Sequence, residues 1–263
     1  MCFGRPEFVT AMLEDLRWFG IRWQEGPDCG GPFGPYSQRE RRALYLAAFE
    51  KLREGGLIYP CKCSRRDVQL ALGAPHQGEE ESIYPGTCRP SQVSNLSVES
   101  SKLIEVAAQR QMASSKSPIS INWRWRVPDG EAVSFVDSAR GPQTFVAGRD
   151  FGDFVVWRHD GAPSYQLAVV VDDAAMQITE VVRGTDLLLS TARQLLLYRA
   201  LGLVPPDFYH IPLVTDPFGV RLAKRHEGLS LRALRASGMA PESLRERPEF
   251  RFTEEENAPK RFR

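Results

Sequence analysis

The chain has 263 residues, 42% of them hydrophobic, which is enough for one large domain or two small ones. Its formal net charge of +1 excludes a strongly basic molecule, but a local basic patch for nucleic acid remains compatible with it. No run of about 18 apolar residues occurs, and M-C-F-G-R-P-E-F at the N-terminus has no apolar signal core. Neither a membrane span nor secretion is therefore expected, and the predicted location is the cytoplasm.

The first predicted element is an amphipathic helix over residues 6–20. Pro6 suits its first turn and Gly20 suits its C-terminal cap. Its apolar face comprises Phe8, Met12, Leu13, Leu16 and Phe19.

A Gly/Pro-rich loop at residues 25–36 separates this helix from a second one, expected over about residues 38–54. Leu57–Tyr59 follows as a short strand. Ser64 and Asp67 have the spacing of a capping box, so a further helix is expected to begin there.

The second half of the chain alternates strand-like and helical patterns, after a helix expected within the Ser-rich residues 91–118. The strand-like runs cover residues 121–127, 133–137, 154–158, 165–173, 178–184 and 210–214. The near-continuous apolar run Y-Q-L-A-V-V-V-D-D (165–173) predicts a buried parallel strand. A helix is expected from Asp186, as its N-cap, to Leu201, ending at Gly202. Strands alternating with helices indicate an α/β domain.

The cysteines suggest a metal site, because five cysteines without a secretory signal argue against a disulfide framework. In an extended segment Cys61 and Cys63 point to the same face, and Cys88 follows after a Pro-Gly turn. Zinc takes four ligands, so Tyr84 or His76 would supply the fourth. The alternative is that the three thiols are small buried hydrophobic side chains.

Cys2 and Cys29 have no partner at a useful spacing and are expected to have no function.

Several motifs together resemble one family. C-K-C followed by Y-P-G-T-C-R resembles the zinc module of the glutamyl-Q tRNA(Asp) synthetases, small paralogues of glutamyl-tRNA synthetase. W-F-G-I-R-W-Q-E-G-P-D, D-G-A-P-S-Y-Q-L-A, V-V-R-G-T-D-L-L and P-L-V-T-D-P-F-G-V-R-L-A-K-R are similar to segments of the same catalytic domain. The resemblance covers about residues 5–235.

The resemblance implies an α/β fold: an incomplete Rossmann-type class I synthetase catalytic domain with an inserted zinc-bearing acceptor-binding subdomain. It implies activation of glutamate with ATP, with Mg²⁺ as the expected companion ion, and transfer of glutamate to the queuosine of tRNA(Asp). A monomer is expected. The implied divisions are 1–58 (first half of the catalytic domain), 59–150 (inserted subdomain), 151–240 (second half) and 241–263 (a charged, loose tail).

The resemblance also assigns roles to individual residues. Tyr165 matches a tyrosine that contacts the substrate amino acid, and Arg183 an arginine that addresses the glutamate side chain, which a guanidinium suits as a bidentate donor. Gly184 and Asp186 are expected to shape the turn into the next helix. Lys224 would stabilise the ATP phosphates, within a loop made of Arg221, Leu222, Ala223, Lys224 and Arg225.

By the same resemblance, Cys61, Cys63, Tyr84 and Cys88 would hold a structural Zn²⁺.

The chain departs from the family pattern in two ways. Ala223 stands where the family usually has serine, and the R-F-A-P-S-P-T-G-like strand, the H-I-G-H-like helix start and the acidic R-I-E-D motif are not found. We therefore expect weak adenylate binding or none from the chain as given, and full activity only from a form extended upstream. The alternatives are a fragment of a discrete glutamyl-tRNA synthetase, a non-catalytic tRNA-binding protein, and a zinc module with a degenerate sheet.

Overall fold

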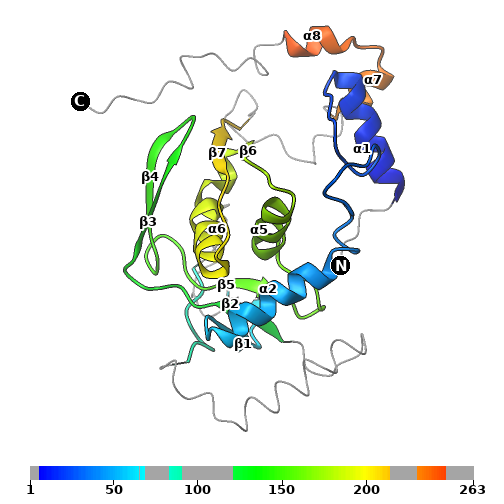
Figure 1. Cartoon of the computed structure of the whole chain (residues 1–263). Helices are drawn as coiled ribbons and strands as arrows, with labels where there is room; N and C mark the ends of the chain where they lie inside the picture. Colours follow the sequence, from blue (N-terminus) through cyan, green and yellow to red (C-terminus); the bar gives the residue numbers. More distant parts are fainter. Residues whose placement is uncertain (1–5, 65, 69–82, 91–120, 214–229, 247–263) are drawn as a thin grey trace, which may run out of the picture.

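The computed structural model describes residues 6–64, 66–68, 83–90, 121–213 and 230–246 (Figure 1). Within these ranges the strands form a three-stranded sheet, β1-β2-β5, and a four-stranded sheet, β4-β3-β7-β6. None of the helices described there has the length and apolar character that a membrane crossing needs.

The three-stranded sheet is antiparallel and consists of β1 (Ile58–Cys61), β2 (Asn122–Trp125) and β5 (Phe154–Trp157). Helix α2 (Arg42–Glu54) lies across it in Figure 1 and packs through Phe49. The Phe49 ring centroid lies 5.3 Å from that of Trp123 and 5.1 Å from that of Trp157. The strands predicted around residues 57–59, 121–127 and 154–158 are confirmed, with shifted ends.

The four-stranded sheet is mixed. Its antiparallel hairpin is β3 (Ala132–Asp137) with β4 (Gly141–Val146), and β7 (Asp207–Ile211) is parallel both to β3 and to β6 (Glu180–Gly184). The strands predicted at 133–137, 178–184 and 210–214 are thereby confirmed, with shifted ends, whereas β4 was not expected. This sheet pairs strands from both sides of residue 150, where a division was predicted.

The apolar run at residues 165–173 is a helix, so its prediction as a buried strand was wrong. Helix α5 (Tyr165–Ala175) is capped by Ser164, whose Oγ accepts a hydrogen bond from the Leu167 backbone N–H at 3.4 Å. Its buried residues, spaced as one face of a helix, are Leu167, Ala168, Val170 and Val171. The β-branched valines suggested a strand, but the helical period of burial and the serine cap determine the structure.

Helix α6 (Leu188–Leu201) follows a short 3₁₀ turn, η1 (Thr185–Leu187). The prediction of Asp186 as N-cap was wrong, because Gly184 caps the turn and Leu187 precedes α6, neither with a side-chain cap. The end at Gly202 is confirmed: its φ of 65° is left-handed, a conformation in which glycine has no steric penalty. Helices α5 and α6 pack on each other and share one hydrophobic core with both sheets.

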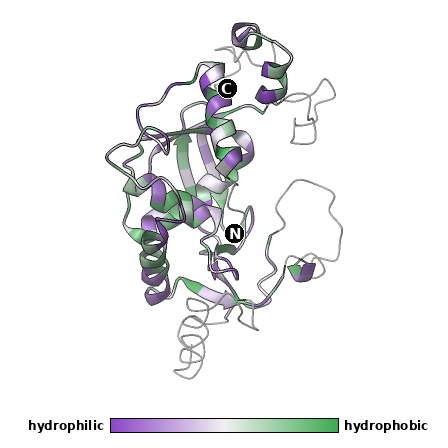
Figure 2. Cartoon of the chain, turned by 90° about the vertical axis from the view of Figure 1, so that its right-hand side faces the viewer, coloured by the Kyte–Doolittle hydropathy of each residue, from purple (hydrophilic) through white to green (hydrophobic). Residues whose placement is uncertain are grey.

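Helix α1 (Pro6–Phe19) is confirmed as a helix, but its predicted apolar face is only partly covered. Phe8 is 63% exposed and Met12 is 54% exposed. In Figure 1 the helix lies beside α7 (Leu231–Ala236) and α8 (Pro241–Arg245), and Asp15 pairs with arginines of α7. Figure 2 shows green and purple residues along the same helices, as expected for amphipathic elements.

Two predictions lie largely outside the described residues. The helix expected within 91–118 cannot be compared, and only the first part of the segment predicted as a tail is described, where α8 forms.

Candidate metal centre and candidate active site

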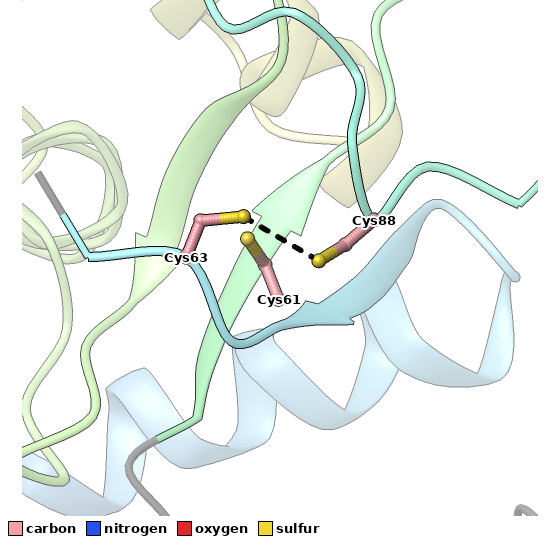
Figure 3. Close-up of side chains that lie close together, drawn as sticks. All are labelled: Cys61, Cys63 and Cys88. Carbon is pink, nitrogen blue, oxygen red and sulfur yellow. Dashed lines mark hydrogen bonds between the residues drawn. The ribbon is translucent and has the colours of Figure 1, made fainter. Parts of the chain in front are cut away.

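Three cysteines meet where β1 ends (Figure 3). Cys61 is the last residue of β1, Cys63 follows two residues later, and Cys88 comes from the segment 83–90. Their three Sγ atoms all lie within 4.8 Å of one another, with Cys63 Sγ 3.6 Å from Cys88 Sγ. The thiol of Cys88 therefore lies beside those of Cys61 and Cys63, which were expected to point to the same face.

Tyr84 supplies an oxygen to the same cluster. Its hydroxyl lies 3.4 Å from Cys61 Sγ and 3.5 Å from Cys63 Sγ, and it accepts a hydrogen bond from the Cys88 backbone N–H at 2.8 Å. A tetrahedral zinc with bonds of about 2.3 Å to sulfur and about 2.0 Å to oxygen places two sulfurs about 3.8 Å apart and a sulfur about 3.5 Å from the oxygen. The four ligand atoms thus fit such an ion with little movement.

The protonation of these groups determines how many protons a bound cation would displace. Burial raises the pKa of the Cys63 thiol and that of the Tyr84 phenol. At Cys88 burial acts in the same direction, but donation from the Lys62 backbone N–H and the Tyr84 hydroxyl outweighs it, and the pKa falls. Buried thiols and a phenol give up their protons together only when a metal replaces them, which links metal binding to proton release.

The segment 83–90 is fixed against the sheet by contacts that the sequence did not suggest. Arg89 donates to Asp129 at 2.6 Å and to the Val127 carbonyl at 2.6 Å, and it lies 3.4 Å from buried Asp153. Gly152 lies so close that a Cβ there would stand 2.7 Å from Ile83 Cγ2. The absence of a side chain at Gly152 therefore lets this segment reach the cysteines.

The remaining cysteine predictions are only partly open to comparison. Cys29 is exposed and its Sγ lies 3.8 Å from the Gly30 carbonyl, and the expectation that it has no function stays a prediction. Cys2 and His76, the alternative fourth ligand, lie outside the described residues.

Arg183 stands at the end of β6, where its guanidinium is held by two side chains from other elements. Its Nε donates to His210 Nε2 at 3.0 Å, and its Nη2 donates to Thr191 Oγ1 at 2.6 Å. Its guanidinium carbon also lies 5.3 Å from the centre of the Phe208 ring. Ligands in open α/β sheets bind outside the carboxyl ends of parallel strands, which is where this arginine lies.

A buried carboxylate supports this arrangement. His210 Nδ1 lies 2.6 Å from Asp137 Oδ2, and both side chains are fully buried. Since Arg183 can only donate, His210 Nε2 must accept, and Nδ1 must carry the proton that Asp137 accepts. Burial lowers the pKa of His210, with the Arg183 charge acting in the same direction, so the imidazole is neutral at pH 7. Asp137, His210 and Arg183 therefore form an ordered chain of hydrogen bonds.

Tyr165 opens helix α5 with its side chain 49% exposed. Its neighbour Gln166 donates to Ser190 Oγ at 3.1 Å, and Ser190 is adjacent to Thr191, which accepts from Arg183. One turn of α6 thus contacts both predicted substrate-binding elements. The predicted ATP loop, Arg221 to Arg225, lies outside the described residues.

Sequence reasoning missed Asp137, His210 and Thr191. Asp137 and His210 are far apart in the sequence and meet because β3 and β7 run parallel, with Asp137 aligned to Phe208. The only local signal was a histidine inside a strand-like run, which by itself has many explanations.

Asp173 gives the first testable prediction. Burial, and next the charge of Asp172, raise the pKa of Asp173 to about 6 from 3.8. Its folded-state pKa lies above the unfolded value, so the folded protein binds more protons between pH 4 and 6, and this contribution to stability is lost as pH rises.

Asp173→Asn is therefore expected to stabilise the protein at pH 8 by about 1 kcal/mol after allowance for solvent screening, and by less at pH 5. Urea unfolding at both pH values measures this, and His210, whose lowered pKa acts with the opposite sign, cancels in the comparison with wild type. An equal gain at both pH values would contradict the prediction.

Comparisons with known proteins agree with these features. The family of class I tRNA synthetases (E and Q), catalytic domain, matches residues 4–259. A glutamyl-Q tRNA(Asp) synthetase of Symbiobacterium thermophilum is 48% identical over 92% of this chain and 70% of its own length, and one of Nitratidesulfovibrio vulgaris is 46% identical over 90% and 68%. The crystal structure of a glutamate-tRNA synthetase from Elizabethkingia anophelis matches 85% of this chain and 43% of that chain, with a TM-score of 0.68 and 29% identity.

Proposed function

Since this chain belongs to the class I tRNA synthetases of the glutamate and glutamine type, we propose that it serves the ATP-dependent activation of glutamate and its transfer to the queuosine of tRNA(Asp). Its two relatives at 46–48% identity carry the name glutamyl-Q tRNA(Asp) synthetase, which supports this acceptor. The second candidate is transfer to tRNA(Glu), as the name of the similar solved structure suggests. A cytoplasmic location and a monomeric state stay predictions.

The observation that carries the proposal is the orientation of Arg183. Its Nη2 gives one hydrogen to Thr191, so its second hydrogen and those of Nη1 form a fork that matches a carboxylate. The glutamate side chain ends in this group. Tyr165, exposed at the start of α5, would contact the same substrate, and Lys224 would stabilise the ATP phosphates.

We further propose that Cys61, Cys63, Cys88 and Tyr84 bind a structural zinc. All four coordination positions of this zinc would be taken by protein ligands, so none is left for a substrate. Its role would therefore be to stabilise the fold of the inserted subdomain. The divisions at 59–150 and 151–240 stay predictions, and both sheets join strands from either side of residue 150.

The test of the proposed reaction is glutamate-dependent ATP–pyrophosphate exchange, followed by transfer of labelled glutamate to tRNA(Asp) with and without queuosine and to tRNA(Glu). This chain and the same chain joined to its upstream coding sequence are compared. Labelling only of queuosine-containing tRNA(Asp) is expected. Labelling of tRNA(Glu) would select the second candidate, and no exchange by either form would overturn the enzymatic function.

Replacing Arg183 by lysine is expected to raise the KM for glutamate about 10–100-fold, because the planar fork is lost while the charge stays. The KM for ATP should change little. Steady-state exchange kinetics measure both constants. Arg199→Lys is the matched control, because Arg199 lies on the outside of α6 in an exposed ion pair with Glu131. Equal glutamate KM values in the two variants would contradict the role of Arg183.

A further inference from the structure

We propose that Arg124 is a positioning residue of the metal centre, which orients the Tyr84 phenol toward the ion and offsets the negative charge of the ligands. This inference rests on the zinc site proposed above. Arg124 is outside the ligand set, and neither the cysteine spacing nor the motifs of the sequence pointed to it.

The sheet delivers Arg124 to the cluster. In the antiparallel pairing of β1 with β2, Arg124 stands opposite Tyr59, while Cys61 stands opposite Asn122. Arg124 and Cys61 are therefore diagonal neighbours across two hydrogen-bonded strands, a separation that a long side chain spans readily. The position is set by the ladder and does not depend on a surface loop.

The contacts of Arg124 join the two halves of the cluster. Its Nε donates to Cys61 Sγ at 3.3 Å, and its guanidinium carbon lies 3.9 Å from the centre of the Tyr84 ring. Its Nη1 donates to the Asp153 carbonyl at 3.1 Å, which fixes the plane of the guanidinium. One side chain thus holds a ligand sulfur from β1 and covers the face of the ring that carries the ligand oxygen.

Charge gives Arg124 a second role. Three thiolates and a phenolate carry four negative charges against the two positive charges of zinc. A guanidinium in direct contact with a ligand sulfur reduces this excess in a partly buried site, where unpaired charge is costly. A hydrogen bond to a ligand sulfur also restrains its direction, as outer-shell groups do for other metal ligands.

Asp153, whose carbonyl accepts from Arg124, is itself held in place by hydrogen bonds. Its Oδ2 accepts from the Tyr59 hydroxyl at 2.5 Å and its Oδ1 accepts from the Val127 backbone N–H at 2.9 Å. Arg89, next to the ligand Cys88, lies 3.4 Å from the same carboxylate. Because Asp153 is itself fixed by the sheet, Arg124 is bound to a rigid support and its position does not need the metal.

The experiment compares zinc affinity, measured by competition with a chromophoric chelator, in the wild-type chain, Arg124→Met and Arg124→Lys. Arg126→Met is the matched control, since Arg126 lies two residues further along and its backbone N–H pairs with the Leu57 carbonyl, four residues before Cys61. We expect Arg124→Met to bind zinc about 10–100-fold more weakly than Arg126→Met. Arg124→Lys, which keeps the charge but loses the planar stack, should lie between them.

A second readout separates positioning from general destabilisation. Cobalt(II) replaces zinc in each variant, and its absorption reports whether the ion stays four-coordinate with thiolate ligands. Arg124→Met is expected to alter this spectrum at saturating cobalt, whereas a fold that is merely less stable would leave it unchanged. If Arg124→Met does not fold, Arg124→Lys carries the same test.

The outcomes are distinct. Equal zinc affinities and cobalt spectra in Arg124→Met and Arg126→Met would overturn the role of Arg124 while leaving the metal site intact. A wild-type chain that binds no zinc would overturn both. Neither outcome depends on aminoacylation, so a failure of the proposed reaction would be seen separately in the exchange assay.

Discussion

Replacing Cys63 with serine is expected to abolish tight metal binding and to lower the melting temperature by roughly 5–10 °C. The reason is that a structural zinc contributes its binding free energy only to the folded state. Cys63 Sγ lies 3.6 Å from Cys88 Sγ and 3.5 Å from the Tyr84 hydroxyl, which are distances that a shared zinc ion would require. The small cluster of Tyr59, Cys61 and Tyr84 is separate from the main core, so the fall in melting temperature is expected to be limited and the main core to stay folded below it.

Metal analysis and thermal unfolding measure this effect. Cys29→Ser is the matched control, because Cys29 is an exposed free thiol outside the cluster. Addition of a chelator to the wild type should reproduce the melting temperature of Cys63→Ser and leave that variant unchanged. Glutamate affinity should change less than stability. The reverse order of effects would contradict a structural role for the ion.

Asp137→Ala is expected to lower the free energy of unfolding by about 3–5 kcal/mol. The carboxylate is fully buried and accepts from His210 Nδ1 as well as from the backbone N–H groups of Ala139, Arg140 and His210. Alanine leaves these donors without a partner in a site closed to water. Asp207→Ala, at the exposed start of β7, should change stability by no more than about 0.5 kcal/mol.

Urea unfolding of the two variants measures the difference. Asp137→Asn is a useful second variant, because asparagine keeps the shape of the aspartate side chain but loses its charge, and it permits the His210 ring to change its orientation. In that variant the KM for glutamate should rise more than the KM for ATP. A loss of stability below about 1 kcal/mol in Asp137→Ala would show that the carboxylate is not the support of the histidine.

The gathering of the three cysteines and Tyr84 was largely predictable from the sequence, whereas the support of Arg183 was not, because the residues involved are much farther apart in the chain. Cys61 and Cys63 lie two residues apart at the end of β1, and Tyr84 and Cys88 share one turn, so local geometry was enough to bring each pair together. The partners of Arg183 come from α6 and β7, and they meet it only once the parallel sheet has formed. No local pattern encodes such a meeting.

The error at residues 165–173 has a similar origin. Three successive valines favour a strand by intrinsic preference, since β-branched side chains lose rotamer freedom in a helix. Burial of residues 167, 168, 170 and 171 against α6 and the sheet outweighs that preference. The cap at Ser164 was visible in the sequence, and weighing it against the apolar run would have reversed the prediction.

The pairing of Cys61 with Asn122 has a consequence for how the protein tolerates change in length. The chain leaves β1 at Cys61 and enters β2 at Asn122, which lies directly opposite Cys61. The pairing of the two strands therefore holds together the two ends of the segment between these residues. Arg89 ties the near part of that excursion to residues 127–129, beyond the return strand. Arg89 and Asn122 are therefore each held by the sheet, whatever the length of chain between them. A change in chain length between these two points is expected to leave both the strand pairing and the cysteine cluster in place.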